Sequence, residues 1–308
     1  MALISLPPRR HRHDEWSGRP HMSFRPECAP AREVEQSRRG RSCRDASTLL
    51  SAVSDSLRSM SGATALYAFG SLAEGKEDAF SDVDLIVVSN DLEASLAARH
   101  GVLSRVAPLS LEWEIAPSRD AWAATYLFAG ISLYHKLDLG FVASGDVVDG
   151  VQMWRHHSSH LAQSEGRSMG VPYAPAPGTV EHVVTGHLLG VTRYVKARRR
   201  GNDLLCWRFA SALLDATLAL LYVKSCQKPV LDRRLTTTEY LELDARLDPA
   251  VRSRVVQRMQ LAPASTMDGS VRLLVTDMLQ TSADLGASIP DSLTAQLMAF
   301  FDAELDPN

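Results

Sequence analysis

The pattern of apolar and polar positions changes character about halfway along the chain. Residues 46–60 carry apolar side chains every three to four positions, which predicts a helix. Short apolar or alternating runs predict four strands, over residues 64–69, 82–88, 109–115 and 133–142. Between these runs, residues 91–103 and 118–128 are predicted to be helical. Strands interleaved with helices predict a mixed sheet with flanking helices over residues 46–148.

The second half of the chain shows helical spacing alone. It predicts six helices, over residues 179–200, 203–226, 236–247, 249–260, 267–285 and 290–305. The longest apolar run, 209–223, is interrupted by Ser211 and Asp215 and is shorter than the about 18 residues that a membrane span needs. We therefore expect a core helix and no membrane partner. Trp207 has helical spacing from apolar neighbours and is predicted to lie in the core.

These elements predict an α+β fold, in which the mixed sheet is followed by an all-helical bundle. The domain boundaries follow from the changes in pattern: a sheet domain at 46–148, a linker at 149–178 that is rich in glycine and proline, and a helical C-terminal domain at 179–308. Residues 1–45 contain several prolines and little apolar periodicity, so we expect a disordered extension.

Charge is distributed unevenly along the chain. Residues 1–45 hold ten arginines against six acidic residues, a local charge of +4. Because the net charge of the whole chain is −3, residues 46–308 carry a charge of −7. An acidic body is not typical of a surface that binds polynucleotides, and we expect no nucleic-acid partner. It suits a cationic small molecule, which it would attract electrostatically. The four cysteines show no zinc-ligand spacing, which fits a reducing cytoplasm.

The strongest chemical signal is Gly70-Ser71, followed after ten residues by Asp82-Val83-Asp84. Side chains alternate along a strand, so Asp82 and Asp84 point the same way, roughly 7 Å apart. Paired carboxylates are ligands that Mg²⁺ prefers, and a Gly-Ser turn can bring backbone N–H groups close to an anion. A phosphate-binding turn beside a metal site indicates chemistry on a nucleoside triphosphate.

Phosphoryl transfer with two metal ions needs a further carboxylate. Asp138 lies alone in an apolar strand, where an unpaired carboxylate is costly to bury unless a cation accompanies it. Glu112 and Glu114 share one face of the third predicted strand and are the alternatives, as third carboxylate or as general base.

The Gly70-Ser71 … Asp82-x-Asp84 motif and its apolar tail resemble the signature of the DNA-polymerase-β-like nucleotidyltransferases. Within that superfamily the chain most resembles the aminoglycoside 6-adenylyltransferases among the antibiotic nucleotidyltransferases. Leu137-Asp138-Leu139 is similar to the strand that carries their third carboxylate.

The resemblance implies a Mg²⁺-dependent enzyme that uses two ions. It would transfer a nucleoside monophosphate, AMP from ATP or that of another NTP, to a hydroxyl of a small acceptor such as an aminoglycoside-like antibiotic. Asp82, Asp84 and Asp138 would be both the metal ligands and the catalytic residues. Gly70, Ser71 and Lys76 would bind the phosphates. A protein or RNA acceptor, or a non-catalytic nucleotide-binding module on the same fold, is the alternative.

Two further features bear on the phosphates. Many members of the superfamily carry arginine at the position of Glu74. Here either Lys76 takes over the phosphate contact, or Glu74 turns away into the capping box that Ser71-x-x-Glu74 predicts. The basic segment Tyr194–Arg200 resembles one in the helical domain of the same antibiotic enzymes. Lys196 or Arg200 would reach a phosphate from there, or the segment is simply a basic helix end.

Overall fold

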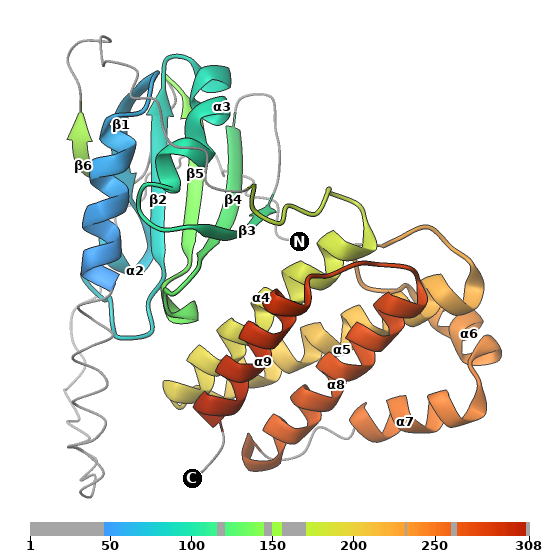
Figure 1. Ribbon diagram of the computed structural model, residues 1–308. Coiled ribbons are helices and arrows are strands. Elements are labelled where there is room, and N and C mark those ends of the chain that lie inside the picture. Colours follow the sequence, from blue (N-terminus) through green and yellow to red (C-terminus); the bar gives the residue numbers. More distant parts are fainter. Residues whose placement is uncertain are drawn as a thin grey trace, which may run out of the picture.

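A computed structural model describes residues 46–115, 121–144, 150–155, 171–231, 233–259 and 264–305. The predicted N-terminal extension, 1–45, lies outside the described residues. The chain forms a mixed sheet with flanking helices and, beside it, a helical C-terminal region (Figure 1). The α+β fold predicted from the sequence is confirmed.

Within the described residues the sheet has six strands, in the order β3-β4-β5-β2-β1-β6. The strands are β1 Ala63–Ala68, β2 Val83–Ser89, β3 Leu109–Glu114, β4 Ala121–Phe128, β5 Leu137–Ala143 and β6 Val151–Arg155. The central strands β2 and β5 pair in parallel, and the other neighbouring strands pair antiparallel. The sheet is therefore mixed, with its parallel pair at the centre.

One face of the sheet is covered by the helix at residues 46–58 and by α3, Leu92–Leu103 (Figure 1). Val53 and Leu57 from the first helix are buried in one core with Leu85 of β2. Because side chains alternate along a strand, the burial of Leu85 against the helices turns Asp84 to the opposite face. The same alternation applies to β5, where Leu137 and Leu139 join this core.

The helical region contains α4 Val180–Arg199, α5 Asp203–Cys226, α6 Thr237–Arg246, α7 Pro249–Met259, α8 Ala264–Asp284 and α9 Asp291–Leu305. Thr179 and Asn202 cap α4 and α5 with their side chains. Among the described helices, α5 is long and apolar enough to cross a membrane, yet 56% of its most apolar window is buried inside the structure. It packs against α4 and α8 as the central helix of the bundle.

The helical region packs against the second face of the sheet at its β3–β4 edge. Leu111 of β3 and Leu127 of β4 are buried in the same core as the helices. The Trp113 indole Nε1 donates a hydrogen bond of 2.9 Å to the backbone oxygen of His182 in α4. This contact holds α4 over the face that carries Asp84.

Three predictions about secondary structure are wrong. Residues 118–128 are predicted to be helical, but β4 covers 121–128, and its side chains are buried on both faces, so they lack the polar alternation of a half-exposed strand. The predicted linker, 149–178, contains β6, which pairs with β1 at the sheet edge. The fourth predicted strand, 133–142, begins with a 3₁₀ turn at Leu133–His135.

Candidate active site

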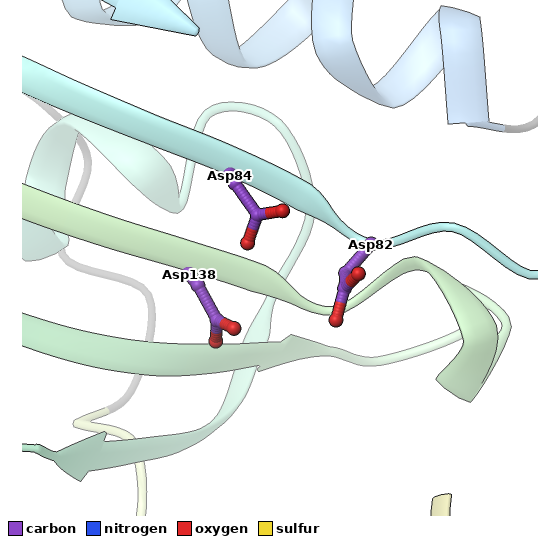
Figure 2. Close-up of side chains that lie close together, drawn as sticks. All are labelled: Asp82, Asp84 and Asp138. Carbon is purple, nitrogen blue, oxygen red and sulfur yellow. The ribbon is translucent and has the colours of Figure 1, made fainter. Parts of the chain in front are cut away.

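Three carboxylates meet on the face of the sheet opposite the covering helices. Asp84 on β2 and Asp138 on β5 are direct partners in the parallel pairing, and Asp82 lies just before β2. Each offers an oxygen within 4.8 Å of the others. Figure 2 shows the three side chains pointing toward one shared space. We call these residues the carboxylate triad.

The negative charges of the triad act most strongly on Asp84. Burial, followed by the neighbouring Asp82 and Asp138 carboxylates, raises the pKa of Asp84 to about 7. Burial also acts to raise the pKa of Asp82, but the Lys196 and Lys136 ammonium groups hold it well below its usual range. The triad thus carries more negative charge than its neighbourhood balances.

Two buried lysines adjoin the triad from different parts of the fold. Lys136 Nζ lies 2.8 Å from Asp82 Oδ2 and also contacts Asp138 Oδ2, and its side chain is 1% exposed. Lys196 Nζ, from α4, lies 3.1 Å from Asp82 Oδ2 with 5% of its side chain exposed. The Lys196 contact is an ion pair by distance only, since among the described residues this ammonium has no hydrogen-bond partner. Burial lowers the pKa of Lys196 to about 8, although Asp82 opposes the shift.

The sequence reasoning named Lys196 as an alternative but missed Lys136. The signal was present, because Lys136 stands two residues before Asp138 and therefore faces the same side of the strand. It also missed Thr125 of β4, whose hydroxyl donates a hydrogen bond of 2.5 Å to Asp138 Oδ1. Thr125 and Lys136 together fix the Asp138 carboxylate.

The Gly70-Ser71 turn lies directly against the triad. Gly70 begins α2, Gly70–Ala73, with a φ of +62°, and a Cβ placed on it would come 2.6 Å from Asp84 Oδ2. The backbone N–H of Phe69 donates to the backbone oxygen of Asp84 at 3.1 Å, which ties the turn to β2. A residue with a side chain at position 70 would displace the Asp84 carboxylate.

The predicted capping box of Ser71 and Glu74 is wrong. Ser71 lies inside α2, whose N-cap is Phe69, and no side chain caps the helix. Glu74 ends the helix and pairs with Lys76 at 2.9 Å in the solvent, where the Lys76 side chain is 75% exposed. The phosphate role of Lys76 stays a prediction, and the ammonium groups at the triad are those of Lys136 and Lys196.

Glu112 and Glu114, the alternatives to Asp138, lie on the other face of the sheet. Glu112 pairs in register with Tyr126, which is buried under the covering helices. It forms an ion pair with Arg99 at 2.8 Å and contacts His100, both from α3. Burial acts to raise its pKa, but hydrogen bonds from His100 and Arg99 lower it to about 2. Glu114 is two positions further along β3 and faces the same way, so neither joins the triad.

Helix α4 contacts the loop that leads into the triad as well as the triad itself. The Arg200 guanidinium, at the end of α4, forms hydrogen bonds of 2.7 and 2.8 Å to the two oxygens of Asp78.

Trp207, at the start of α5, is 52% exposed, so its prediction as a core residue is wrong.

The triad suits a hard divalent cation. It offers oxygen ligands alone, which Mg²⁺ prefers over the softer metals. Its carboxylates are brought together in spite of their mutual repulsion, a repulsion that a cation between them would remove.

The chain was compared with family models, curated sequences and solved structures. Residues 50–121 match the family model described as a nucleotidyltransferase domain, a stretch that contains Gly70, Ser71, Asp82 and Asp84 and ends before Asp138. Among solved structures the chain is similar to an aminoglycoside 6-adenyltransferase from Bacillus subtilis, with 12% identity and a TM-score of 0.30 over 82% of this chain and 97% of that chain. No curated protein sequence matches the chain.

Proposed function

On the premise that residues 50–121 form a nucleotidyltransferase domain, we propose that this enzyme transfers AMP from ATP to a hydroxyl group of a small-molecule acceptor. The family match assigns nucleotidyl transfer to the chain, while the nucleotide, the acceptor and the metal belong to the proposal. One observation carries it: within this domain, the Gly70-Ser71 turn lies against a triad of carboxylates that share one space.

Asp82, Asp84 and Asp138 would hold two Mg²⁺ ions. When bound, the ions would neutralise the negative charge that develops on the attacking and leaving oxygens at the α-phosphorus. The support is the donor set, because three carboxylates within 4.8 Å of one another offer the hard oxygen ligands that this ion requires.

The residues around the triad have separate roles in the proposed reaction. Asp138, held by Thr125 and Lys136, would accept the proton of the acceptor hydroxyl. The Gly70-Ser71 turn would offer backbone N–H groups and a hydroxyl to the phosphates. Lys196 would bind a phosphate oxygen, since its ammonium has three N–H donors and among the described residues forms an ion pair with Asp82 alone.

We propose a cationic acceptor, such as an aminoglycoside-like antibiotic, which adenylylation would inactivate. The support is charge: the net charge of −7 on residues 46–308 attracts a polycation, whereas a polynucleotide would be repelled. The sheet face of the triad continues into the contact with α4, so the helical region would form one wall of the acceptor site. We place the reaction in the cytoplasm.

The test is transfer of label from α-labelled ATP, with Mg²⁺, to aminoglycosides, lincosamides, RNA and a cell lysate. We expect label on a small cationic acceptor, together with release of pyrophosphate. Asp84→Asn should lower the rate by about 10³-fold or more, because it removes a metal ligand. Asp244→Asn, which changes an exposed aspartate on α6, is the matched control and should keep the rate.

The other outcomes separate the alternatives. Label on RNA or on a protein band would replace the small acceptor by a macromolecule and leave the reaction class intact. Absence of transfer from every nucleoside triphosphate, together with nucleotide binding that does not depend on Mg²⁺, would reject the catalytic proposal in favour of a binding module.

A further inference from the structure

We propose that Lys136 is an internal counter-ion of the carboxylate triad, which a divalent metal ion must displace in order to bind. The ammonium group would thus set the affinity of the site for metal. This inference rests on the proposed function, since it takes the triad to be the metal site.

The position of Lys136 is fixed by the sheet. Its backbone oxygen accepts a hydrogen bond of 3.0 Å from the N–H of Val83, the residue between Asp82 and Asp84. The next residue, Leu137, is the register partner of Val83 in the parallel pair β2–β5. The side chain therefore leaves a rigid backbone position and points along the same face as Asp138.

The ammonium of Lys136 lies at the position that a metal ion shared by Asp82 and Asp138 would take. Its Nζ bridges the Oδ2 atoms of Asp82 and Asp138, two of the three carboxylates. Mg²⁺ binds carboxylate oxygens at about 2.0–2.1 Å, so an ion held by this pair would occupy the same space as the ammonium. Two cations cannot both lie there, because they would repel each other strongly at that separation.

Lys196 differs from Lys136 in what it blocks. Its ammonium approaches Asp82 alone, from α4, and leaves Asp138 free of contact with it. The three carboxylates and two ammonium groups carry one net negative formal charge, so the two lysines supply half of the positive charge that two Mg²⁺ ions would bring. Lys136 therefore lies between two of the carboxylates that would bind the metal ion, whereas Lys196 lies beside one of them.

The length of the lysine side chain allows the exchange. Four flexible methylene groups connect the ammonium to the fixed backbone, so the charge can move without a change in the strand. A metal ion that takes the two Oδ2 atoms would release the ammonium toward the space in front of the triad. There it would meet the phosphates of the nucleotide as an additional cation.

The experiment measures Mn²⁺ binding, by the electron paramagnetic resonance of free Mn²⁺, to the full chain stripped with EDTA and without nucleotide. We expect Lys136→Met to bind Mn²⁺ about 10-fold more tightly than the wild type, because no ammonium has to be displaced. The same variant should melt at a lower temperature in EDTA, where its carboxylates have lost a counter-ion, and should gain more in Tm from added Mn²⁺.

Lys224→Met is the matched control. It removes an ammonium that pairs with Asp284 at 2.6 Å in the helical region, far along the chain from the triad residues. Its Mn²⁺ affinity should equal that of the wild type. Lys136→Gln, which removes the charge and keeps a hydrogen-bond donor, repeats the comparison if Lys136→Met does not fold.

Each outcome is decisive. If the variants at position 136 bind Mn²⁺ no more tightly than the wild type, Lys136 is a permanent ion-pair partner and the proposal is wrong, while the metal site stands. If neither the wild type nor these variants bind Mn²⁺, the triad is not a metal site, and the proposed function fails together with this inference.

Discussion

Buried or half-buried carboxylates occur on both faces of this sheet, in opposite electrostatic surroundings. Under the covering helices, Glu112 is paired with Arg99 and His100. On the other face, three aspartates share the ammonium groups of Lys136 and Lys196. The charge of Glu112 is matched by the Arg99 guanidinium, whereas the triad keeps an excess of negative charge.

Under the proposed function, this difference separates a structural charge from a functional one. A matched ion pair is satisfied by the fold and has no remaining capacity for a ligand. An unbalanced cluster is held together at the expense of stability, and the excess charge is available to a cation. The pKa values follow the same division, since the pKa of Glu112 is lowered to about 2 and the pKa of Asp84 is raised to about 7.

The largest effect should come from the triad. Asp138→Asn keeps the acceptor of the Thr125 hydrogen bond but removes the charge that, in the proposed reaction, would bind metal and accept a proton. We expect nucleotidyl transfer to fall by about 10³-fold or more, with a change of about 1 kcal/mol or less in the free energy of unfolding. Initial rates with labelled ATP and urea unfolding measure the two quantities. If Asp138→Asn instead lowers the free energy of unfolding and its folded fraction keeps the specific activity, Asp138 has a structural role and the proposed roles of the two faces are wrong.

The opposite pattern is expected on the other face. Glu112→Gln leaves the Arg99 guanidinium without its charged partner, so the free energy of unfolding should fall by about 3 kcal/mol. The specific activity of the folded fraction should be unchanged, because Glu112 lies on the face away from the triad. Unfolding by urea at pH 7, compared with the transfer rate at low temperature, tests both statements.

The pH dependence of the free energy of unfolding tests whether the charge of Glu112 is what stabilises the fold. The pKa of Glu112 is lower in the folded chain than its ordinary value of 4.5. Its stabilising effect is therefore complete above about pH 4.5 and is lost as the pH falls toward 2. The difference in stability between the wild type and Glu112→Gln should shrink over this window. A difference that stays constant with pH would mean that packing, not charge, explains the loss.

Sequence reasoning found the aspartates because their spacing along the chain is local information. Asp82 and Asp84 follow a two-residue strand period, and Asp138 stands out in an apolar run. Glu112 and Glu114 show the same period, and nothing local tells which face of the sheet they occupy. That depends on the register of β3 with β4, a strand whose burial on both faces gave it the appearance of a helix.

The smallest effect concerns the space between Gly70 and Asp84. In Gly70→Ala the new Cβ would lie 2.6 Å from Asp84 Oδ2, so the carboxylate must turn away from the triad. We expect the transfer rate to fall about 10- to 100-fold from this misplacement. The positive φ should lower the free energy of unfolding by about 1 kcal/mol.

Gly75→Ala separates the two causes. Gly75 has the same φ of +62°, but a Cβ there would meet no atom within 4 Å. The backbone strain is therefore the same, and the stability should fall equally, by about 1 kcal/mol. The transfer rate of Gly75→Ala should stay close to that of the wild type. Equal loss of activity in both variants would assign the effect to the backbone of the turn, and Gly70 would then not be a residue that makes room for the Asp84 carboxylate.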